Sequence, residues 1–349
     1  MRVLVELPEE LDAEQWRARH AEGAVPDATP YGLHRIGDAR TAVRFRPPLR
    51  RATGIATKVR NRLGGYDVLA KALAPHRFGA DVLLCMDERT GIPAALHPGR
   101  TPVVSGIAWL EDPRSLSAAH ARLAATGMRR MAAVFSQSPA LTPALCEHWD
   151  LDPGRVHEID LGIDEQFYPA QPEETAGPIV ASVGDDRNRD HATLVAAVAA
   201  ARAGGTGCTL ELATTLPVEV PESLGVVHRK RMGAGMRGIY RRCGLVAVAL
   251  HENRVGSGLT VVLEAMASAR PIVVTANPGM ERYVRHGIDG LLVPAGDPAA
   301  MGAAIGELLA DPQRCRAMGR AARARVRERF TSAHMAGQLR ELLGKAVRR

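Results

Sequence analysis

Residues 245 to 275 combine features that can bind a phosphate-bearing ligand. An apolar run typical of a strand leads into a glycine-containing loop, and a helical pattern begins after Gly258. Glycine lets the backbone approach a ligand closely, and the amides of Leu259 and Thr260 are donors at a helix N-terminus, where the helix dipole favours an anion. The hydroxyl of Ser257 can add a contact. A purely structural turn fits the local pattern equally well.

Glu264 lies further along the same helical pattern, which is otherwise apolar. A carboxylate more than one turn from the helix N-terminus suits two neighbouring hydroxyls, such as those of a ribose. The alternative is a glutamate that faces solvent. Local features alone leave both interpretations open.

Two series of short apolar runs, separated by helical patterns, must position these residues. The runs lie at residues 3–5, 80–85, 101–104 and 132–135 in the first series, and at 179–183, 208–212, 245–250 and 271–275 in the second. Continuous apolar runs of this kind predict parallel sheets covered on both faces. Residues 161–177, punctuated by Gly, Asp and Pro, separate the series. The sequence therefore predicts two doubly wound α/β domains, and we expect the site in a cleft between them, beyond the carboxyl ends of the strands.

Length and composition exclude several classes of protein. The chain has 349 residues, 46% hydrophobic and 24% charged, which excludes a disordered or fibrous protein and allows two cores. It contains no stretch of about 18 apolar residues, so no membrane span is predicted. The N-terminus has no secretory signal pattern, and a cytoplasmic protein is expected.

The net charge of +7 invites a nucleic-acid interpretation that the composition does not favour. The cations are overwhelmingly arginine, and aromatic residues make up only 4% of the chain, too few for base-stacking platforms. The five cysteines are widely spaced without a CxxC pair, and the histidines show no HExxH spacing. We therefore expect neither a nucleic-acid partner nor a metal site, and the cysteines are expected to be reduced.

The run SGLTVVLEAMASARPIVVT, residues 257–275, resembles the donor-binding motif of GT-B glycosyltransferases of the large retaining family 4. Residues 136–145 together with 162–169 resemble the interdomain crossover of that family. Residues 287–298 resemble its GxxGxLVPxGDP run, and residues 308–330 resemble its C-terminal helices. The resemblance is firm from about residue 130 to 335.

The resemblance implies the GT-B fold, with two Rossmann-like domains facing across a cleft. An acceptor-binding domain is expected at residues 1–163 and a donor-binding domain at residues 164–330. Residues 331–349 are expected to form a C-terminal helix that packs back on the first domain. The sequence does not determine the oligomeric state.

The resemblance also implies roles for the donor-binding residues. Glu264 would hold the nucleotide ribose, and the amides of Leu259 and Thr260, with Ser257 and Gly258 beside them, would hold the diphosphate.

A second loop, which follows the run at 179–183, is expected to face the same ligand. Gly184 opens this loop, and Arg187 or Arg189, or both, would clamp the phosphates as catalytic cations, although a solvated charged loop is the alternative. His228 lies where the family contacts the nucleobase.

In the first domain, Asp87 and Glu88 follow the predicted strand at 80–85. Their carboxylates are candidates for orienting an acceptor hydroxyl or acting as a general base. A capped turn between strand and helix explains them equally well.

The resemblance implies a retaining transfer of a sugar from a nucleoside-diphosphate sugar, UDP or GDP, to a hydroxyl of a small-molecule or natural-product acceptor. Neither a metal nor another cofactor is expected. The chain departs from the family at Gly256, where the first of two paired glutamates usually stands. The alternatives are therefore a non-catalytic nucleotide-sugar binding protein and a sugar-nucleotide epimerase on the same scaffold.

Overall fold

The computed structural model describes residues 1–48, 66, 79–170 and 177–348, and these form two compact units. The first unit comprises Met1–Glu22, Pro26–Asp160 and Ser332–Arg349, and the second comprises Gly23–Val25 and Leu161–Thr331. The second unit begins at Leu161, three residues before the predicted boundary. Local contacts explain this position, because the Leu161 amide donates to the Tyr283 hydroxyl and Ile163 bridges to Thr331 within the second unit.

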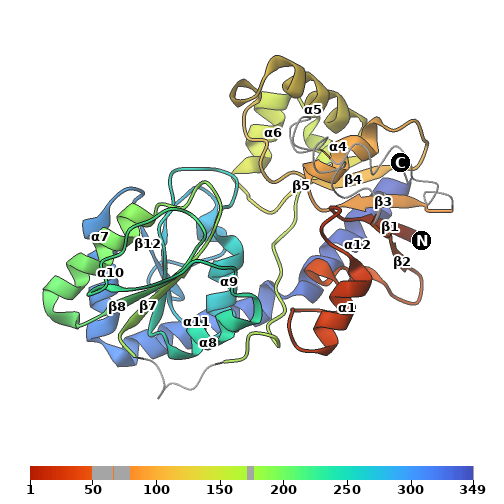
Figure 1. Ribbon diagram of the computed structural model, residues 1–349. Coiled ribbons are helices and arrows are strands. Elements are labelled where there is room, and N and C mark those ends of the chain that lie inside the picture. The colour runs from red at the N-terminus through yellow and green to blue at the C-terminus, as the bar shows by residue number, and fades with distance from the viewer. Residues whose placement is uncertain (49–65, 67–78, 171–176, 349) are drawn as a thin grey trace. The chain divides into compact units, whose positions relative to one another are not determined.

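The first unit contains a six-stranded sheet in which every pairing is parallel (Figure 1). Its order is β2-β1-β3-β4-β5-β6. The strands are β1 (Arg2–Glu6), β2 (Ala42–Phe45), β3 (Val82–Cys85), β4 (Val103–Gly106), β5 (Ala133–Ser136) and β6 (Val156–Glu158), and the α-helices described are α1 (Ala13–Ala21), α4 (Glu88–Leu96), α5 (Ala118–Arg130), α6 (Leu141–Trp149) and α12 (Ser332–Arg348). The inner strands β3, β4 and β5 are buried along their whole length, as the continuous apolar runs predict.

The second unit contains another six-stranded parallel sheet, of order β12-β11-β10-β7-β8-β9. Its strands are β7 (Ile179–Val183), β8 (Thr209–Ala213), β9 (Gly225–His228), β10 (Leu245–Val248), β11 (Ile272–Thr275) and β12 (Gly290–Val293), and its α-helices are α7 (His191–Ala201), α8 (Met236–Arg242), α9 (Leu259–Ala267), α10 (Pro298–Ala310) and α11 (Pro312–Arg329). The chain starts in the middle of the sheet, runs to one edge and then crosses back to fill the other half. This is the strand order of the dinucleotide-binding fold, and the order reverses between β7 and β10.

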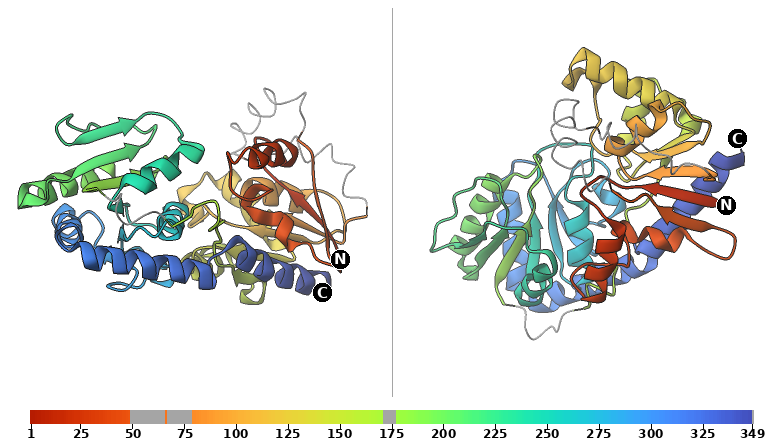
Figure 2. Two further views of the ribbon diagram at one scale, coloured as in Figure 1. Left: turned by 90° about the horizontal axis from the view of Figure 1, so that it is seen from below. Right: turned by 45° about the vertical axis from the view of Figure 1, so that its right-hand side comes forward.

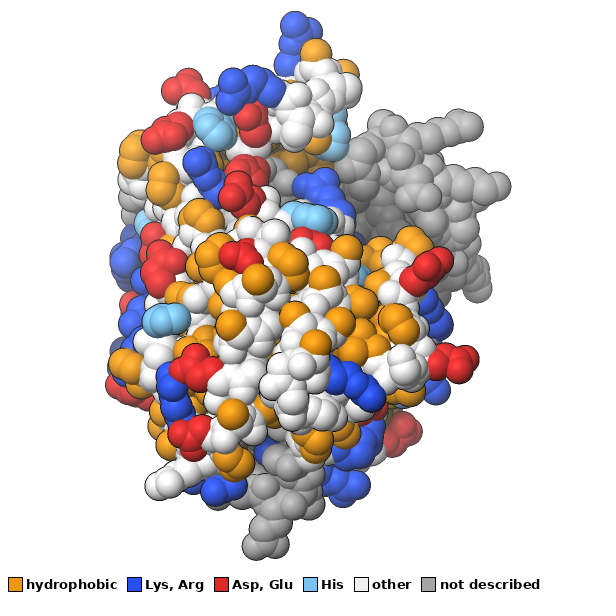
Figure 3. Space-filling model, turned by 90° about the vertical axis from the view of Figure 1, so that its left-hand side faces the viewer, with side chains coloured by type: hydrophobic (Ala, Val, Ile, Leu, Met, Phe, Trp, Pro, Cys, Tyr) orange, Lys and Arg blue, Asp and Glu red, His pale blue; other side chains and the backbone are white. Residues whose placement is uncertain are grey.

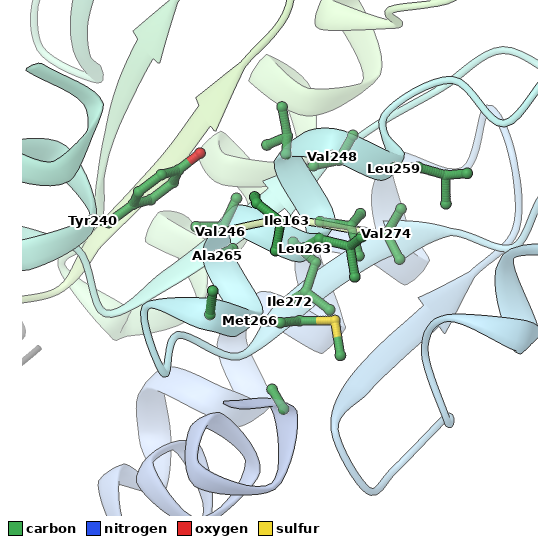
Figure 4. Packing of buried hydrophobic residues seen from close by; sticks show 14 of the residues in the cluster. Ile163, Tyr240, Val246, Val248, Leu259, Leu263, Ala265, Met266, Ile272 and Val274 are labelled. Carbon is green, nitrogen blue, oxygen red and sulfur yellow. The ribbon is translucent and has the colours of Figure 1, made fainter. Parts of the chain in front are cut away.

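Helices cover both faces of this second sheet and bury a separate hydrophobic cluster on each (Figures 1 and 2). One cluster joins α8, α9 and α11 to the sheet, and the other joins α7 and α10 to it. Figure 4 shows the first cluster, in which Leu263 and Met266 of α9 pack with Val246 of β10 and Ile272 of β11. Because α9 is clamped in this way, its amino end is held at a fixed place on the sheet.

The expectation of α/β sheets with Rossmann-like topology is confirmed, and the apolar runs correspond to the inner strands. The apolar runs did not predict β2, β6, β9 or β12, which are the four edge strands of the two sheets. Three of these edge strands, β2, β6 and β9, are partly exposed along their length. They therefore lack the continuous apolar run that is typical of an inner strand.

No helix in the described ranges is both long enough and apolar enough to cross a membrane. The five cysteines carry free thiols, and all but Cys146 are buried. On the face drawn in Figure 3, Lys and Arg side chains lie mainly toward the periphery, while hydrophobic and uncharged groups occupy the middle. The excess of arginine therefore does not make this face a continuous basic surface.

Candidate functional site

The point where the second sheet reverses its order brings two loops together. One loop follows β7 and the other follows β10. Backbone hydrogen bonds join them: the Asp190 amide donates to the Ala249 carbonyl at 3.1 Å, and the His251 amide donates to the Asn188 carbonyl at 2.9 Å. In open α/β sheets, ligands bind at this edge and at this reversal of strand order.

The amino end of α9 lies on the second of these loops. Gly258 takes the N-cap position with a φ of 84°, and no side chain caps the helix there. A Cβ at Gly258 would lie 3.1 Å from Val248 Cγ1 and 3.4 Å from Arg189 Nη1, so the position needs glycine for its backbone angle and for space. The Leu259 amide reaches the Gly256 carbonyl at 3.3 Å. The Leu259 amide, one of the two expected phosphate donors, thus already has a backbone partner. The following amides of the first turn, that of Thr260 among them, are the donors that the positive end of the helix dipole offers to an external acceptor.

Arg189 supplies the cation at this site. Its side chain is only 6% exposed, and its Nε donates to Asp186 Oδ2 at 2.7 Å. Its Nη1 is buried and has no hydrogen-bond partner in the part of the chain that the structure describes. A buried donor without a partner costs about 1–3 kcal/mol, and an anion beside it would recover that cost. Among the described residues of the second unit, this atom is therefore a strong candidate to donate a hydrogen bond to an anionic ligand.

Gly184 makes room for this arginine. A Cβ at Gly184 would lie 2.1 Å from Arg189 Nε and 2.4 Å from its Cζ, so the guanidinium lies directly against the glycine backbone. The neighbouring Arg187 is exposed. Of the two predicted phosphate clamps, the structure thus brings Arg189 against the amino end of α9 and leaves Arg187 on the surface of the loop.

Asp186 joins the two loops, and the sequence analysis did not assign it a role. Its Oδ2 accepts from Arg189, while its Oδ1 accepts from the Asn188 amide at 3.0 Å and from the Ser257 hydroxyl. Ser257 was expected to contact the ligand, and its hydroxyl proton is directed to this aspartate instead. Asp186 therefore links Arg189 to the glycine-containing loop before α9. Asp186 and Ser257 are 71 positions apart in the sequence, so no local sequence pattern predicts their contact.

Glu264 is held by two tyrosines that the sequence analysis also missed. The Tyr168 hydroxyl donates to Glu264 Oε1 and the Tyr240 hydroxyl donates to Oε2, each at 2.7 Å. Burial raises the pKa of Glu264, while the two tyrosine hydroxyls and the charge of Arg189 act in the opposite direction. Each carboxylate oxygen keeps a further lone pair, so Glu264 can accept a ligand hydroxyl without losing either tyrosine.

His228 ends β9, and its Nε2 lies 2.9 Å from Glu211 Oε1. Asp185, which directly follows Gly184, accepts from the Thr215 amide at 2.6 Å. Burial acts to raise the pKa of Asp185, but hydrogen bonds from Thr215 and Thr214 lower it overall. These contacts explain Asp185 as a loop anchor, and the nucleobase role of His228 stays a prediction.

In the first unit, Asp87 and Glu88 have local partners. Asp87 caps α4 by accepting from the Arg89 amide at 3.0 Å and also binds the Arg89 guanidinium. Glu88 accepts the amides of Ala108 and Trp109 at 2.8 and 3.0 Å. Burial, followed by the charge of Asp87, raises the pKa of Glu88 to about 7. The contacts fit the capped-turn alternative, and the general-base role stays a prediction.

The capped-turn interpretation of Glu88 makes a testable prediction. Replacing Glu88 by glutamine places an NH2 group against one of the two amide donors, and we expect a loss of about 1–3 kcal/mol in unfolding free energy. Turnover measured below the melting temperature should change by less than about 10-fold. A general base would instead lose about 100-fold or more and change the pH profile of kcat, which would contradict the structural interpretation.

Comparison with known proteins gives a family match and relatives for this chain. Residues 178–311, which include both loops and α9, match the family model described as glycosyl transferases group 1. The chain is 29% identical over 239 residues to a D-inositol 3-phosphate glycosyltransferase of Salinispora tropica, covering 58% of this chain and 48% of the relative. It is 32% identical over 229 residues to an alpha-maltose-1-phosphate synthase of Mycolicibacterium smegmatis, covering 56% of this chain and 58% of the relative. The chain thus spans about half the length of the curated relatives it matches.

Solved structures show the same fold over the whole chain. One is HepE of Anabaena, solved in complex with UDP and glucose, with a TM-score of 0.67 and 17% sequence identity. The match covers 98% of this chain and 99% of HepE. A sucrose-phosphate synthase of Thermosynechococcus elongatus has a TM-score of 0.71 at 17% identity, with 99% of each chain covered. The chain therefore has the GT-B fold of two Rossmann-like domains, and residues 178–311 of its second unit match the model of the group 1 glycosyl transferases.

Proposed function

We propose that this protein is a retaining glycosyltransferase that moves a sugar from a nucleoside-diphosphate sugar to a hydroxyl of a small-molecule acceptor. The observation that carries the proposal is the buried, unpartnered Nη1 of Arg189 beside the uncapped amino end of α9. A diphosphate supplies the acceptor oxygens that both donors need. Its charge grows as the sugar departs, so donors fixed in advance stabilise the transition state more than the ground state.

The other residues of the site fit the remainder of such a donor. The carboxylate of Glu264, fixed by Tyr168 and Tyr240, is suited to accept the two ribose hydroxyls. The leaving diphosphate would help to accept the proton of the acceptor, so the protein supplies positioning and charge rather than a nucleophile. The HepE structures, described as complexes with UDP and with UDP-glucose, support a uridine diphosphate donor among the candidates.

The acceptor proposal rests on the curated relatives. Both relatives carry the name of a phosphorylated small molecule, an inositol phosphate in one and a maltose phosphate in the other. This supports a small hydroxylated acceptor over a polymer. The first unit would bind the acceptor.

One observation favours a binding protein without transfer activity. Gly256 stands where the resemblance places the first of two paired glutamates, so the carboxylate that usually contacts the sugar is absent at that position. A protein that binds the nucleotide sugar but does not react with it would keep Arg189 and Glu264 for affinity alone.

A donor screen separates the two functions. The purified chain is incubated with UDP-, GDP-, ADP- and dTDP-sugars, with and without inositol phosphates and sugar phosphates, and release of the nucleoside diphosphate is measured. We expect one nucleotide to be released, with a product whose anomeric configuration matches the donor. If one donor raises the melting temperature but none is hydrolysed or transferred, the binding protein is the correct function.

A further inference from the structure

A buried histidine contacts the loop that carries Arg189. His191 is the first residue of α7 and is only 7% exposed. Asp190 caps the same helix end by accepting from the Thr193 amide at 3.0 Å and from the Thr193 hydroxyl at 2.6 Å. Because the cap fixes this end of α7, the backbone from which the imidazole extends is fixed as well.

The imidazole of His191 turns toward the Gly184 carbonyl. Its Nε2 lies 3.2 Å from that oxygen and 3.2 Å from Thr214 Oγ1. A carbonyl oxygen only accepts hydrogen bonds, so Nε2 carries a proton and donates it to Gly184.

The surroundings of His191 favour the neutral ring. Burial lowers the pKa of His191, while the hydrogen bond to the Gly184 carbonyl opposes this shift. The charge of Arg189 also lowers the pKa, and the two aspartates that follow Gly184 act to raise it. A neutral imidazole has one N–H group, and here that group is used to hold Gly184.

Thr214 holds the same glycine from the loop after β8. Its buried hydroxyl donates to the Gly184 carbonyl at 2.7 Å and accepts from the Leu216 amide at 3.1 Å. The Gly184 amide in turn donates to the Ala213 carbonyl at 3.1 Å. The peptide groups on both sides of Gly184 are therefore fixed by the end of β8 and the start of α7.

The position of Gly184 limits the position of Arg189. The guanidinium lies directly against the Gly184 backbone, where even a Cβ atom would overlap it. A rotation of either peptide group would push the guanidinium away or open a gap beside it, because packed groups transmit such displacements. Asp186 holds Nε of the same guanidinium, so the aspartate and the glycine together determine where Nη1 points.

We propose that His191 is a positioning residue of the donor site, which fixes Gly184 through Nε2 and thereby directs the buried Nη1 of Arg189 at the diphosphate. The inference rests on the proposed function, because it requires a diphosphate beside Arg189. His191 acts through Arg189 and has Thr214 as its partner. Misplacing a group that contacts the reacting atoms by about 1 Å can cost about 100-fold in rate.

Replacing His191 by phenylalanine keeps a ring and removes the donor. We expect turnover to fall by about 10- to 100-fold and the affinity for pyrophosphate, measured by titration calorimetry, to fall by about 3- to 10-fold. His191→Gln has an amide that can donate in place of Nε2, and it should keep turnover within about 3-fold of the natural chain.

His148→Phe is the matched control for this variant. The Nδ1 atom of His148 lies 3.0 Å from the Glu111 carbonyl, so this histidine also contacts a loop carbonyl, but in the first unit. The control should change turnover and pyrophosphate affinity by less than about 2-fold. Equal effects of His191→Phe and His148→Phe would overturn the proposal.

A double-mutant cycle with Arg189→Gln separates positioning from a general loss of stability. If His191 acts through Arg189, adding His191→Phe to Arg189→Gln should change the single-turnover rate by less than about 2-fold, because the group that it positions is already gone. The same loss in both backgrounds would show that His191 acts independently of Arg189, which overturns the proposal. Melting temperatures show which variants are folded at the temperature of the assay.

Thr214→Val tests the same contact if His191→Phe does not fold. Valine keeps the shape of threonine and removes the hydroxyl that joins His191 to the Gly184 carbonyl. We expect a loss of turnover that again depends on Arg189, while Thr214→Ser stays close to the natural chain. Equal losses in Thr214→Val and Thr214→Ser would contradict the proposal.

The natural chain distinguishes failure of this inference from failure of the proposed function. If it neither binds pyrophosphate nor releases a nucleoside diphosphate from any donor, the proposed function is wrong and the positioning role is wrong with it. If it binds pyrophosphate without transferring a sugar, the affinities of the same variants complete the cycle. If it is active but the cycle is additive, only the role of His191 is wrong.

Discussion

Replacing Arg189 by glutamine should lower turnover by about 100- to 1,000-fold, the cost that follows when one fixed donor is removed from a developing oxyanion. The effect is large because Arg189 is buried: its charge acts in a poorly solvated place, and its Nη1 has no competing hydrogen bond among the described residues. Single-turnover rates with the donor found in the screen measure the loss.

Arg187 is the matched control for this variant. It lies two positions away in the same loop, carries the same charge and is exposed. Arg187→Gln should change turnover by less than about 10-fold, because solvent screens an exposed charge. Equal losses in the two variants would show that the loop acts only through its overall charge, which contradicts the assignment of the phosphate contact to Arg189.

Replacing Glu264 by glutamine should weaken binding of the nucleoside diphosphate by about 10- to 100-fold, because hydrogen bonds to a charged group contribute about 1.5–3 kcal/mol. The amide keeps the shape of the carboxylate, but its NH2 group faces a tyrosine hydroxyl and cannot accept from the ribose. Calorimetric titration of UDP and GDP against the variant gives the change in affinity.

Binding of pyrophosphate to the Glu264→Gln variant shows whether the substitution removes a ribose contact or disturbs the whole donor site. Pyrophosphate reaches the arginine and the amino end of α9 but has no ribose, so its affinity at the donor site should be the same for Glu264→Gln as for the natural chain. Tyr168→Phe removes one support of the carboxylate and is expected to weaken nucleotide binding less than Glu264→Gln does. An equal loss of pyrophosphate and UDP affinity in Glu264→Gln would remove the ribose assignment.

Local patterns predicted much of the fold because they report local structure. The inner strands are apolar on both faces, and the helices between them repeat their apolar residues with helical spacing. Both kinds of element can therefore be predicted from short stretches of sequence. The edge strands were missed because one side of each lies outside the sheet, and β6 has only three residues. The glycine-containing loop before α9 was predictable because Gly258 has a positive φ that side chains rarely adopt.

What the sequence by itself determined is the pair of α/β domains, the donor-type motif at residues 257–275 and the set of residues from which the site is drawn. The tertiary structure decided which of them lie together at the amino end of α9. Arg189 rather than Arg187 reaches the amino end of α9, because Gly184 leaves space for its guanidinium and Asp186 holds it.

The tertiary structure also gave partners to residues whose role the sequence left open. Glu264 is fixed by tyrosines 96 and 24 positions away, and Glu88 turns to amides 20 and 21 positions away. The direction of a side chain in a loop, or on a buried helix face, depends on atoms brought near by the folding of distant segments. A local pattern carries no information about those atoms, and this is the physical reason that the site became visible only in the folded chain.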